Sequence, residues 1–428
     1  MNENPIDREL LRRRDAVASE WCLRDQVVLI GAGEPIHRPG RDDMTYRYEA
    51  HSEYYYLTDR NRPGGVLAFD PNEGWVEFLA PVTVDERLWS GAPEGDVEGP
   101  TTDELPGWIE PRRGRPLAWL GSAPEDARSD ASLAEEARFG LAAVRRIKDE
   151  VELERMRAAQ RATRAAFAAV VPLLSAGISE RQVQVELEAE ALRHGVDAMG
   201  YDTIVGSGPN SAVLHFPPSS RRLQDGELVL IDAGAQYLGY ASDITRTYPV
   251  GGMFTTEQQE LHALVRQAEL AAIERCQAGV EWRDIHLLAG LVIAEGLVAF
   301  GLLNGDPESL VESGAAWLFF PHGIGHLVGL GVRDAGGTPL RERRDDPKPY
   351  ANLRIDLPLE PGMAVTVEPG IYFVPAILND PDRRREHRDQ VNWDKVDAMP
   401  DFGGIRIEDN LVIGESGHEI LTADVPVT

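Results

Sequence analysis

Five side chains in the second half of the sequence have the composition of a metal site. Four are carboxylates and one is an imidazole: Asp232, Asp243, His326, Glu368 and Glu408. Each lies in an otherwise apolar or glycine-rich run, where an unpaired charge is costly to bury. Oxygen-rich ligation with one nitrogen suits Mn²⁺, and less selectively Co²⁺ or Zn²⁺, whereas a structural zinc site would contain cysteine. Four carboxylates balance two divalent ions better than one, so the pattern predicts a two-metal site that activates a water molecule.

The two aspartates belong to one predicted hairpin. Strand-like runs flank residues 234–240, where Gly239 suits a tight turn. If the hairpin is centred on Tyr237 and Leu238, Asp232 and Asp243 face each other directly, and two carboxylates at that separation repel. A shared proton or a metal ion would neutralise them. On these residues alone, two exposed turn aspartates are an equally good interpretation.

The other donors also have structural alternatives when they are taken singly. The run Pro321-His-Gly-Ile-Gly-His326 places two histidines among glycines, and a single buried histidine is more often a core residue than a ligand. Glu368 ends an apolar strand at a proline, where a buried carboxylate needs a partner. Alternation puts Arg406 and Glu408 on one face, where they could form a simple ion pair in solvent. It is the joint occurrence that favours a metal site.

The elements expected to position these residues change character near residue 149. Residues 1–148 mix short apolar runs with helical segments at both ends, which predicts a small α/β domain. Residues 149–428 begin with a long helical segment, residues 150–174, and carry all of the candidate metal ligands. We therefore expect two domains, with the chemistry in the second.

The same order of elements is expected twice in the second domain. A pair of helices precedes strands, and then another pair of helices precedes more strands, which predicts two similar halves around a central sheet. One helix in each half opens with a capping box, Ser179 with Gln182 and Thr256 with Gln259. The expected strands occupy residues 206–216, 228–250, 364–373 and 404–412.

The bulk composition excludes several classes of function. A formal net charge of -28 argues against nucleic acid and against anionic membrane surfaces as partners. Two cysteines, Cys22 and Cys276, cannot build a disulfide framework. The most apolar stretch, residues 287–303, contains Glu295 and is too short to span a bilayer. Because residues 1–20 lack the apolar core of a secretory signal, we expect a cytoplasmic location.

At the candidate metal residues the sequence resembles the creatinase/aminopeptidase P/prolidase group of metallopeptidases. The resemblance implies an α/β (α+β) protein in which a creatinase-like mixed-sheet domain precedes a pseudo-twofold catalytic domain with the pita-bread fold. Shorter likenesses lie at residues 201–210, 214–216 and 52–58. The main matching stretches are Ile231-Asp-Ala-Gly, Ser242-Asp-Ile-Thr-Arg-Thr, His322-Gly-Ile-Gly-His-Leu-Val-Gly-Leu, residues 359–372, and Phe402-Gly-Gly-Ile-Arg-Ile-Glu-Asp.

The resemblance also implies a role for each metal ligand. Asp232 would bind one ion, Asp243 and Glu408 would bridge both ions, and His326 and Glu368 would complete the second. Glu368 would in addition carry a proton from the bridging water to the leaving proline nitrogen.

Four further residues are assigned to catalysis or to substrate by the same resemblance. His215 and His322 would line the site, one polarising the scissile carbonyl and the other positioning the substrate. Arg406 would hold the bridging carboxylates in place. Arg333 stands where family members usually have a second substrate-site histidine. This departure leaves the metal ligands intact and changes how the substrate would be oriented.

Within the group, the resemblance favours a manganese-type Xaa-Pro dipeptidase, a prolidase. Residues 375–401 resemble prolidases, whereas the stretch 201–210 is closer to aminopeptidase P. The leading prediction is hydrolysis of Xaa-Pro dipeptides by a hydroxide between two Mn²⁺-type ions. The alternative is an aminopeptidase P, which removes the N-terminal residue from longer Xaa-Pro peptides. A metal-free adaptor is disfavoured because all five ligand positions carry competent residues.

A dipeptidase must also bind the free carboxylate that follows proline. Arginine suits that task because its guanidinium can hold a carboxylate through two hydrogen bonds. Arg333 in the catalytic domain and Arg47 in the N-terminal domain are the candidates. Since the family is usually dimeric, we expect a homodimer that acts on proline-containing dipeptides or short peptides.

Overall fold

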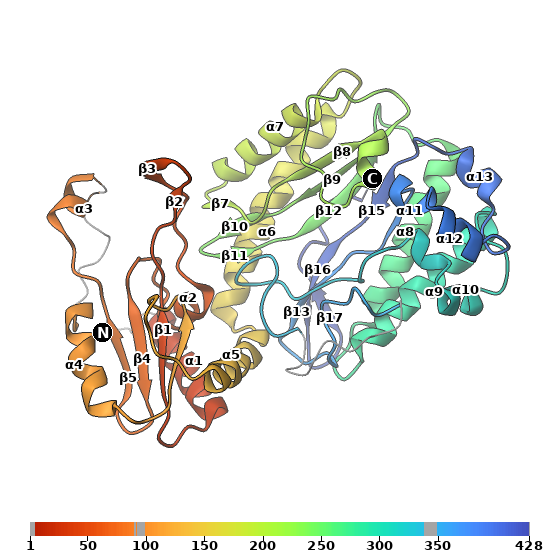
Figure 1. Ribbon diagram of the computed structural model, residues 1–428. Helices are drawn as coiled ribbons and strands as arrows, with labels where there is room; N and C mark the ends of the chain where they lie inside the picture. Colours follow the sequence, from red (N-terminus) through yellow and green to blue (C-terminus); the bar gives the residue numbers. More distant parts are fainter. Residues whose placement is uncertain (1–4, 90, 92–98, 338–348, 428) are drawn as a thin grey trace. The chain divides into compact units, whose positions relative to one another are not determined.

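The computed structural model divides into two compact units, Met1–Arg145 and Arg146–Thr428 (Figure 1). The structure describes residues 5–89, 91, 99–337 and 349–427. The second unit begins at Arg146, whereas the sequence placed the boundary at residue 149. Both units combine helices with sheets, which is the mixed α/β class expected from the sequence. In the described residues, none of the helices combines the length and the apolar character needed to cross a membrane.

A four-stranded mixed sheet forms the centre of the N-terminal unit. Its order is β5 (Gly74–Phe78), β4 (Val66–Asp70), β1 (Val27–Gly31) and β6 (Leu117–Gly121). Strand β1 runs antiparallel to β4 and parallel to β6, and both β1 and β4 are buried along their whole length. The other α-helices and strands described in this unit are α1 (Pro5–Trp21), β2 (His37–Arg38), β3 (Arg41–Thr45), α2 (Ser52–Thr58), α3 (Val84–Trp89), α4 (Leu105–Ile109) and α5 (Ala131–Arg146).

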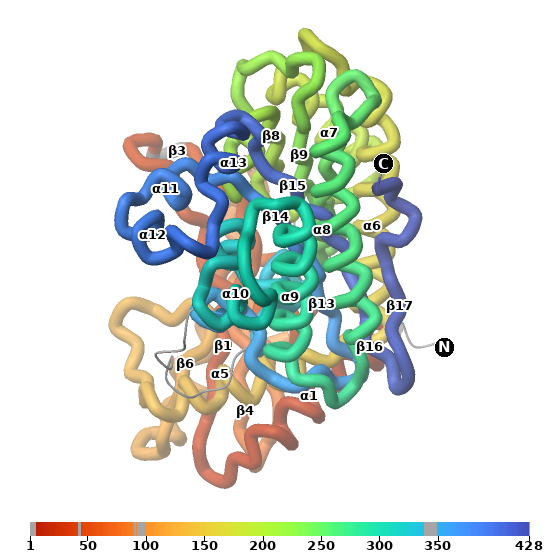
Figure 2. The backbone as a smooth tube through the Cα atoms, turned by 90° about the vertical axis from the view of Figure 1, so that its right-hand side faces the viewer, coloured from red at the N-terminus to blue at the C-terminus, as the bar shows by residue number. Residues whose placement is uncertain are grey.

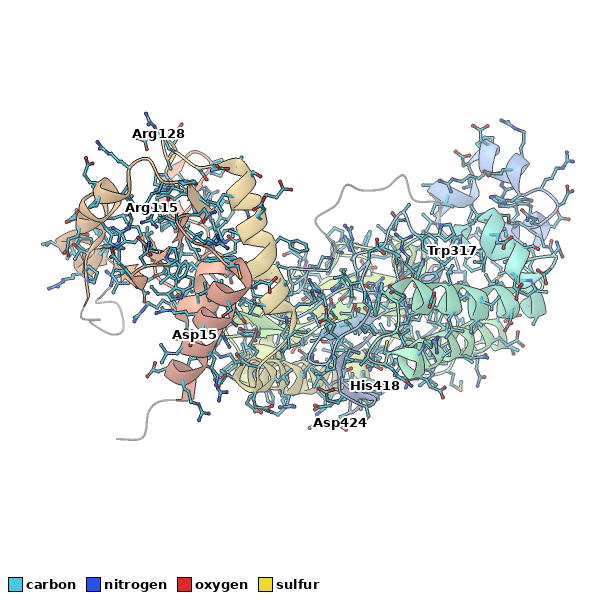
Figure 3. The ribbon with its side chains drawn as sticks, turned by 90° about the horizontal axis from the view of Figure 1, so that it is seen from below. Asp15, Arg115, Arg128, Trp317, His418 and Asp424 are labelled. Carbon is cyan, nitrogen blue, oxygen red and sulfur yellow. The ribbon has the colours of Figure 1, made fainter. Side chains whose placement is uncertain are left out.

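One buried carboxylate at the end of β4 organises the charges of this unit. Asp70 accepts hydrogen bonds from Arg112 at 2.7 Å and from both terminal nitrogens of Arg115 at 2.7 and 3.0 Å. Arg115 is labelled in Figure 3. The two guanidinium groups hold the pKa of Asp70 below its usual value. This cluster contains none of the residues predicted to do chemistry, so we interpret it as structural.

The C-terminal unit contains the repeated order of elements predicted from the sequence. Within each half the two long helices pack against each other, α6 on α7 and α8 on α9 (Figure 2). The first half comprises α6 (Glu150–Val170), α7 (Glu180–Arg193), β7 (Ala198–Met199), β8 (Ile204–Ser207), β9 (Leu228–Ala233), β10 (Ala235–Tyr237), β11 (Tyr240–Ala241) and β12 (Ile244–Pro249). The second comprises α8 (Thr256–Arg275), α9 (Trp282–Phe300), α10 (Pro307–Ser313), β13 (Ala364–Val367), β14 (Gly370–Tyr372), α11 (Pro375–Leu378), α12 (Pro381–Glu386), α13 (Trp393–Asp397), β15 (Gly404–Arg406), β16 (Asp409–Ile413) and β17 (His418–Ile420).

The two halves meet through their sheets. The first half contributes the antiparallel sheet β12-β9-β8, and the second contributes β13-β16-β17. An isolated bridge joins Thr245 of β12 to Glu408, whose backbone nitrogen donates to the Thr245 carbonyl at 3.0 Å. Every residue of β8, β9, β12, β13 and β16 is buried, so side chains on these strands point into a packed interior.

Two local predictions differ from the structure. The capping box of α8 consists of Thr255 and Gln258, one residue earlier than expected, because Thr255 keeps an extended backbone and its hydroxyl accepts from the Gln258 nitrogen at 3.2 Å. The box at Ser179 and Gln182 is confirmed. The expected strand 206–216 is also wrong after Ser207, because Gly208–Ala212 forms a 3₁₀ helix that begins at a positive φ of 51°.

The acidic hairpin has a different register from the one expected. Its centre is Leu238 and Gly239, which both have positive φ, 47° and 81°. Ala233 therefore pairs with Ile244, and Asp232 pairs with Thr245. The prediction that Asp232 and Asp243 lie directly opposite each other is wrong by two residues. A shift of two residues keeps both side chains on the same face of the ladder.

Candidate active site

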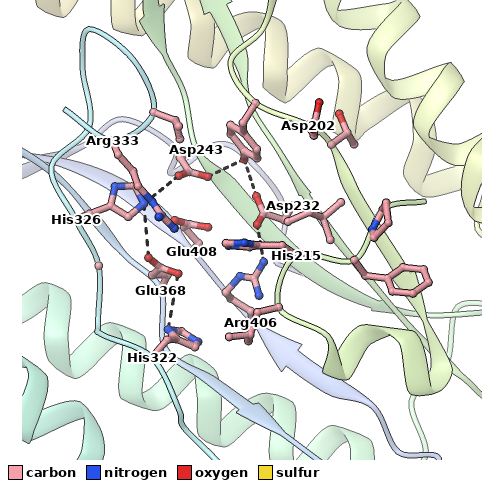
Figure 4. A pocket seen from close by; sticks show the side chains of 18 of the residues that line it. Asp202, His215, Asp232, Asp243, His322, His326, Arg333, Glu368, Arg406 and Glu408 are labelled. Carbon is pink, nitrogen blue, oxygen red and sulfur yellow. Dashed lines mark hydrogen bonds and ion pairs between the residues drawn. The ribbon is translucent and has the colours of Figure 1, made fainter. Parts of the chain in front are cut away.

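A cavity of about 880 Å³ in the C-terminal unit brings the candidate residues together (Figure 4). All five predicted metal ligands line it, and so do His215, His322, Arg333 and Arg406. Arg47 belongs to the N-terminal unit, where its Nε lies 3.9 Å from Glu49 Oε1. Its substrate contact stays a prediction.

Strand ends position the four carboxylates. Asp232 lies on β9, and Asp243 directly precedes β12. Glu368 directly follows β13, and Glu408 directly precedes β16. His326 is held beside β13, because its backbone nitrogen donates to Thr366 Oγ1 at 3.0 Å and its carbonyl accepts from the Thr366 nitrogen at 2.9 Å.

Three of these residues already have the spacing of a metal site. Ligand atoms of Asp243, His326 and Glu408 all lie within 4.8 Å of one another. The Nε2 atom of His326 lies 3.4 Å from Asp243 Oδ2 and 3.7 Å from Glu368 Oε1. The other ring nitrogen, Nδ1, lies 3.0 Å from the Leu327 carbonyl, which can only accept a hydrogen bond. Nδ1 therefore carries a hydrogen, and Nε2 is the ring nitrogen that faces the carboxylates and could bind a metal ion.

The carboxylates of this cluster lie in the protein interior, where cations would be needed to balance their negative charges. Asp232, Asp243 and Glu408 are 7%, 5% and 2% exposed. Burial raises the pKa of Asp232, raises that of Glu408 well above its usual value, and raises that of Glu368 to about 7. Neutralisation by divalent ions would let all of these carboxylates stay ionised at neutral pH. The donor set therefore fits the two-ion site predicted from the sequence.

Arg406 and Thr245 connect the carboxylates to one another. Arg406 Nη2 donates to Asp232 Oδ2, and its Nε donates to Thr245 Oγ1 at 3.0 Å. Thr245 Oγ1 in turn donates to Glu408 Oε2 at 2.7 Å. The direct carboxylate partner of Arg406 is thus Asp232, and Thr245 links Arg406 to Glu408.

Two tyrosines at the site were not singled out by the sequence analysis. The hydroxyl of Tyr201 lies 2.6 Å from Asp232 Oδ1 and 2.6 Å from Asp243 Oδ1. The hydroxyl of Tyr372 accepts from Arg406 Nη1 at 3.0 Å and lies 2.9 Å from His322 Nε2. Both residues lie inside stretches that resemble the family, and this resemblance is the feature of the sequence that could have pointed to them.

The two remaining histidines differ in how they are held. Burial lowers the pKa of His322 to about 3, so its ring is neutral, and its two nitrogens lie 2.9 Å from the Gly323 carbonyl and from the Tyr372 hydroxyl. Burial, followed by Arg333 and Arg406, also lowers the pKa of His215. Among the described residues, none forms a hydrogen bond with the His215 ring. His215 is therefore the histidine that is free to meet a substrate.

Two family patterns match the chain. Residues 154–415 match Metallopeptidase family M24, and residues 10–101 match the Aminopeptidase P, N-terminal domain. The chain belongs to metallopeptidase family M24. The M24 match contains all five predicted metal ligands, and divalent metal ions are the cofactors of this family.

This M24 metallopeptidase is similar along most of its length to proteins named as aminopeptidases. It is 34% identical to a probable Xaa-Pro aminopeptidase of Botryotinia fuckeliana, over 87% of this chain and 84% of that protein. The structure of zinc-substituted E. coli aminopeptidase P in complex with product has a TM-score of 0.81 and 29% identity, over 98% and 96% of the two chains. The structure of proline aminopeptidase P II from Yersinia pestis has a TM-score of 0.80 and 28% identity, over 98% and 97%.

These similarities confirm the family and the order of domains that the sequence predicted, and they change the activity that is favoured. The prolidase and aminopeptidase P group is confirmed, as is an N-terminal aminopeptidase P domain followed by an M24 catalytic domain. The dipeptidase prediction is not supported, and the aminopeptidase alternative fits better. The resemblance of residues 375–401 to prolidases favoured the dipeptidase. These residues form α11, α12 and α13, and the similar proteins that decide against the dipeptidase are named aminopeptidases.

Proposed function

We propose that this M24 metallopeptidase is an Xaa-Pro aminopeptidase, which removes the N-terminal residue from peptides with proline in the second position. The observation that carries the proposal is the set of five buried or half-buried donors around one cavity, in a chain that matches aminopeptidase P over 98% of its length. Four carboxylates and one imidazole suit a metal-assisted hydrolase, and the whole-chain likeness favours the aminopeptidase over the dipeptidase.

The metal centre would use the five predicted ligands. Asp232, Asp243, His326, Glu368 and Glu408 would hold two divalent ions, and the oxygen-rich set favours Mn²⁺. When bound, the ions would lower the pKa of a water molecule and polarise the scissile carbonyl. Tyr201 and Arg406 would keep the aspartates oriented, because each donates directly to a carboxylate oxygen.

Glu368 would carry the proton. The nitrogen of proline has no hydrogen of its own in the peptide, so it must gain a proton to leave as an amine. Glu368 is half-buried at the cavity wall, with its carboxylate 3.9 Å from His322 Nδ1 and 3.7 Å from His326 Nε2. It would accept a proton from the attacking water and return it to the proline nitrogen.

The two other histidines would act on the substrate itself. His215 would donate a hydrogen bond to the scissile carbonyl oxygen as negative charge develops there. Its lowered pKa keeps the ring neutral, with one N–H available and no competing partner among the described residues. His322 would form a fixed wall for the substrate, since the Gly323 carbonyl and the Tyr372 hydroxyl occupy its nitrogens.

Three peptides test the proposal with the Mn²⁺-loaded protein. We expect Ala-Pro-Ala to yield alanine and Pro-Ala, Ala-Ala-Ala to stay intact, and Ala-Pro to be a poorer substrate than Ala-Pro-Ala. Cleavage of Ala-Pro with no cleavage of Ala-Pro-Ala would identify a prolidase instead. If none of the three is cleaved by protein with a full metal content, the peptidase proposal is wrong.

We also propose a cytoplasmic homodimer, which rests on the composition of the chain and on the resemblance to a usually dimeric family. Light scattering after gel filtration should then give twice the chain mass of 47.2 kDa. A mass of one chain at micromolar concentration would contradict the dimer. Recovery of the native protein from a membrane or secreted fraction would contradict the location.

A further inference from the structure

A single buried carboxylate holds both ends of the loop that carries His215. Glu180 is the first residue of α7, which packs against β8 (Figure 1), and it is fully buried. Its Oε1 atom accepts from the Ser207 nitrogen at 2.9 Å and from the Ser207 hydroxyl at 2.8 Å. Its Oε2 atom accepts from the Ser219 nitrogen at 3.1 Å and from the Ser219 hydroxyl. Since Ser207 ends β8 and Ser219 follows His215, both ends of the segment 208–218 are tied to one side chain.

The carboxylate of Glu180 is ionised and well satisfied. Asn210, inside the same loop, donates a further hydrogen bond from its Nδ2 to Oε1 at 2.9 Å. Burial alone would raise the pKa of Glu180, but the hydrogen bonds from Ser219, Asn210 and Ser207 lower it below its usual value. Hydrogen bonds to a charged acceptor are stronger than those between neutral groups. Glu180 is therefore a firm anchor for the loop.

The backbone at the start of α7 makes the same connection. The Arg181 nitrogen donates to the Ser219 carbonyl at 2.9 Å, and the Glu180 nitrogen donates to the Arg221 carbonyl at 3.0 Å. The Arg181 guanidinium donates to the Pro218 carbonyl at 2.6 Å. The end of the loop after His215 is thus fastened to the first turn of α7.

The neighbours of His215 in the sequence are packed, whereas the His215 ring is not. Leu214 and Phe216 pack against a buried cluster that consists of Ile204, Leu230 and Tyr372. His215 itself is exposed and lines the cavity (Figure 4), and none of the described residues forms a hydrogen bond with its ring. Since no side chain orients the ring directly, its position depends on the backbone of the loop.

We propose that Glu180 is a positioning residue, which fixes the loop 208–218 so that the His215 ring meets the scissile carbonyl. This inference rests on the proposed function, in which His215 donates a hydrogen bond to that carbonyl. Glu180 lies outside the cavity lining and acts through His215. A donor must be held in place before the charge develops, because a displacement of about 1 Å can cost about a hundredfold in rate.

Glu180→Gln breaks this anchor while it keeps the size of the side chain. One carboxylate oxygen accepts from the Ser207 backbone N–H, and the other accepts from the Ser219 backbone N–H. Glutamine has one oxygen, so its NH₂ group faces one of these N–H groups whichever way the amide is turned. We expect kcat for Ala-Pro-Ala to fall about ten- to thirtyfold and KM to change less than about threefold, since His215 acts mainly in the transition state. The Mn²⁺ content should stay that of the wild type.

A double-mutant cycle separates positioning from a purely structural role. His215→Ala removes the donor and should lower kcat about a hundredfold. In that background, Glu180→Gln should lower kcat by less than about a further twofold, because the residue through which it acts is gone. Losses that multiply in the double variant, or a normal kcat in Glu180→Gln, would overturn the inference alone. If the Mn²⁺-loaded wild type does not cleave Ala-Pro-Ala, the proposed function is overturned and the inference with it.

The matched control removes a buried carboxylate from the first turn of another helix. Glu152 of α6 accepts from the Asp149 nitrogen at 3.0 Å and from the Tyr240 hydroxyl at 3.2 Å, and Glu152→Gln should keep kcat within about twofold of the wild type. A loss as large as that of Glu180→Gln would count against a specific role of Glu180.

A milder variant keeps the test decisive if Glu180→Gln does not fold, as judged by its Tm. Ser219→Ala removes only the hydroxyl that donates to Glu180 Oε2. It should lower kcat about two- to fivefold in the wild-type background and should have no effect in the His215→Ala background. Equal losses in both backgrounds, or no loss in either, would overturn the inference.

Discussion

Tyr201→Phe tests whether the metal site depends on a residue that is not itself a predicted ligand. The hydroxyl of Tyr201 lies 2.6 Å from one oxygen of Asp232 and 2.6 Å from one oxygen of Asp243. Burial raises the pKa of this tyrosine well above its usual value, so it keeps its hydrogen and acts as a donor. Because it has only one hydrogen, it donates fully to one carboxylate at a time.

The expected loss follows from that single hydrogen. A hydrogen bond to a charged group is worth about 1.5–3 kcal/mol. Since about 1.4 kcal/mol corresponds to a factor of ten, the loss converts to roughly ten- to a hundredfold in metal affinity. The same range is typical when a group that orients a metal ligand is removed. Phenylalanine keeps the ring, so the packing around β9 should not change.

In the assay, metal-free protein is titrated with Mn²⁺. Calorimetry measures the affinity for the metal, and peptide hydrolysis measures the recovery of activity. Tyr201→Phe should bind Mn²⁺ about ten- to a hundredfold more weakly and should regain most of its kcat at saturating metal. Tyr237→Phe is the matched control, because Tyr237 lies on β10 of the same hairpin and its hydroxyl has no hydrogen-bond partner in the described part of the chain. Unchanged Mn²⁺ affinity in Tyr201→Phe would refute the orienting role of its hydroxyl.

Three further predictions address the metals, the proton carrier and acid stability. A chelator should abolish activity and Mn²⁺ should restore it best, with two ions per chain, so full activity with one ion per chain would contradict the two-ion site. Glu368→Gln should lower kcat by at least about a hundredfold at saturating metal, and normal turnover would refute its role as proton carrier. Burial lowers the pKa of His262 and of His286 to about 4, below the unfolded value of about 6.5. The unfolded chain therefore binds more protons between these values, and the stability from these groups is lost as the pH falls from about 6.5 to 4. The Tm of His262→Gln should fall less over this window than that of the wild type, and parallel curves would contradict the prediction.

The acidic hairpin illustrates what the sequence can and cannot determine. Side chains alternate with a period of two, so any register that buried both aspartates had to place them on one face. The turn itself depends on Leu238, a non-glycine residue with a positive φ, which is uncommon. The Leu238 nitrogen is held by Asp197 Oδ2, a residue 41 positions away. A contact of that range is not encoded in the turn sequence. The predicted pairing of Asp232 with Asp243 was therefore wrong, whereas the prediction that both side chains lie on one face of the hairpin was correct.

The ligands and the residues that orient them differed in how well they could be predicted. A carboxylate in an apolar run needs an explanation, because burying it unpaired is costly, and so the joint occurrence of such runs could single out the five residues as candidate ligands. Tyr201 and Tyr372 gave no such signal, since a tyrosine in an apolar strand is ordinary core material. Their function depends on which carboxylate or guanidinium their hydroxyls meet, and that is decided by tertiary packing.

The junction between the two halves explains why the donor geometry is a tertiary property. Asp232 and Asp243 come from the first half, and His326, Glu368 and Glu408 come from the second, so neither half has a complete donor set. Cross-links lie directly beside these donors. Asn410 of β16 accepts from the Asp243 nitrogen at 2.9 Å and donates to the Asp243 carbonyl at 2.6 Å.

A second link runs from Thr245 of β12 to Glu408 at 2.7 Å, and Arg406 of β15 donates to the same threonine and to Asp232. Each link ties a donor of one half to a group in the other. Repulsion among the carboxylates would push the two halves apart. Hydrogen bonds from the neutral Asn410 and Thr245 side chains and from the Arg406 guanidinium oppose that repulsion directly beside the carboxylates. The fold therefore holds the donors close together through the contacts that join its halves.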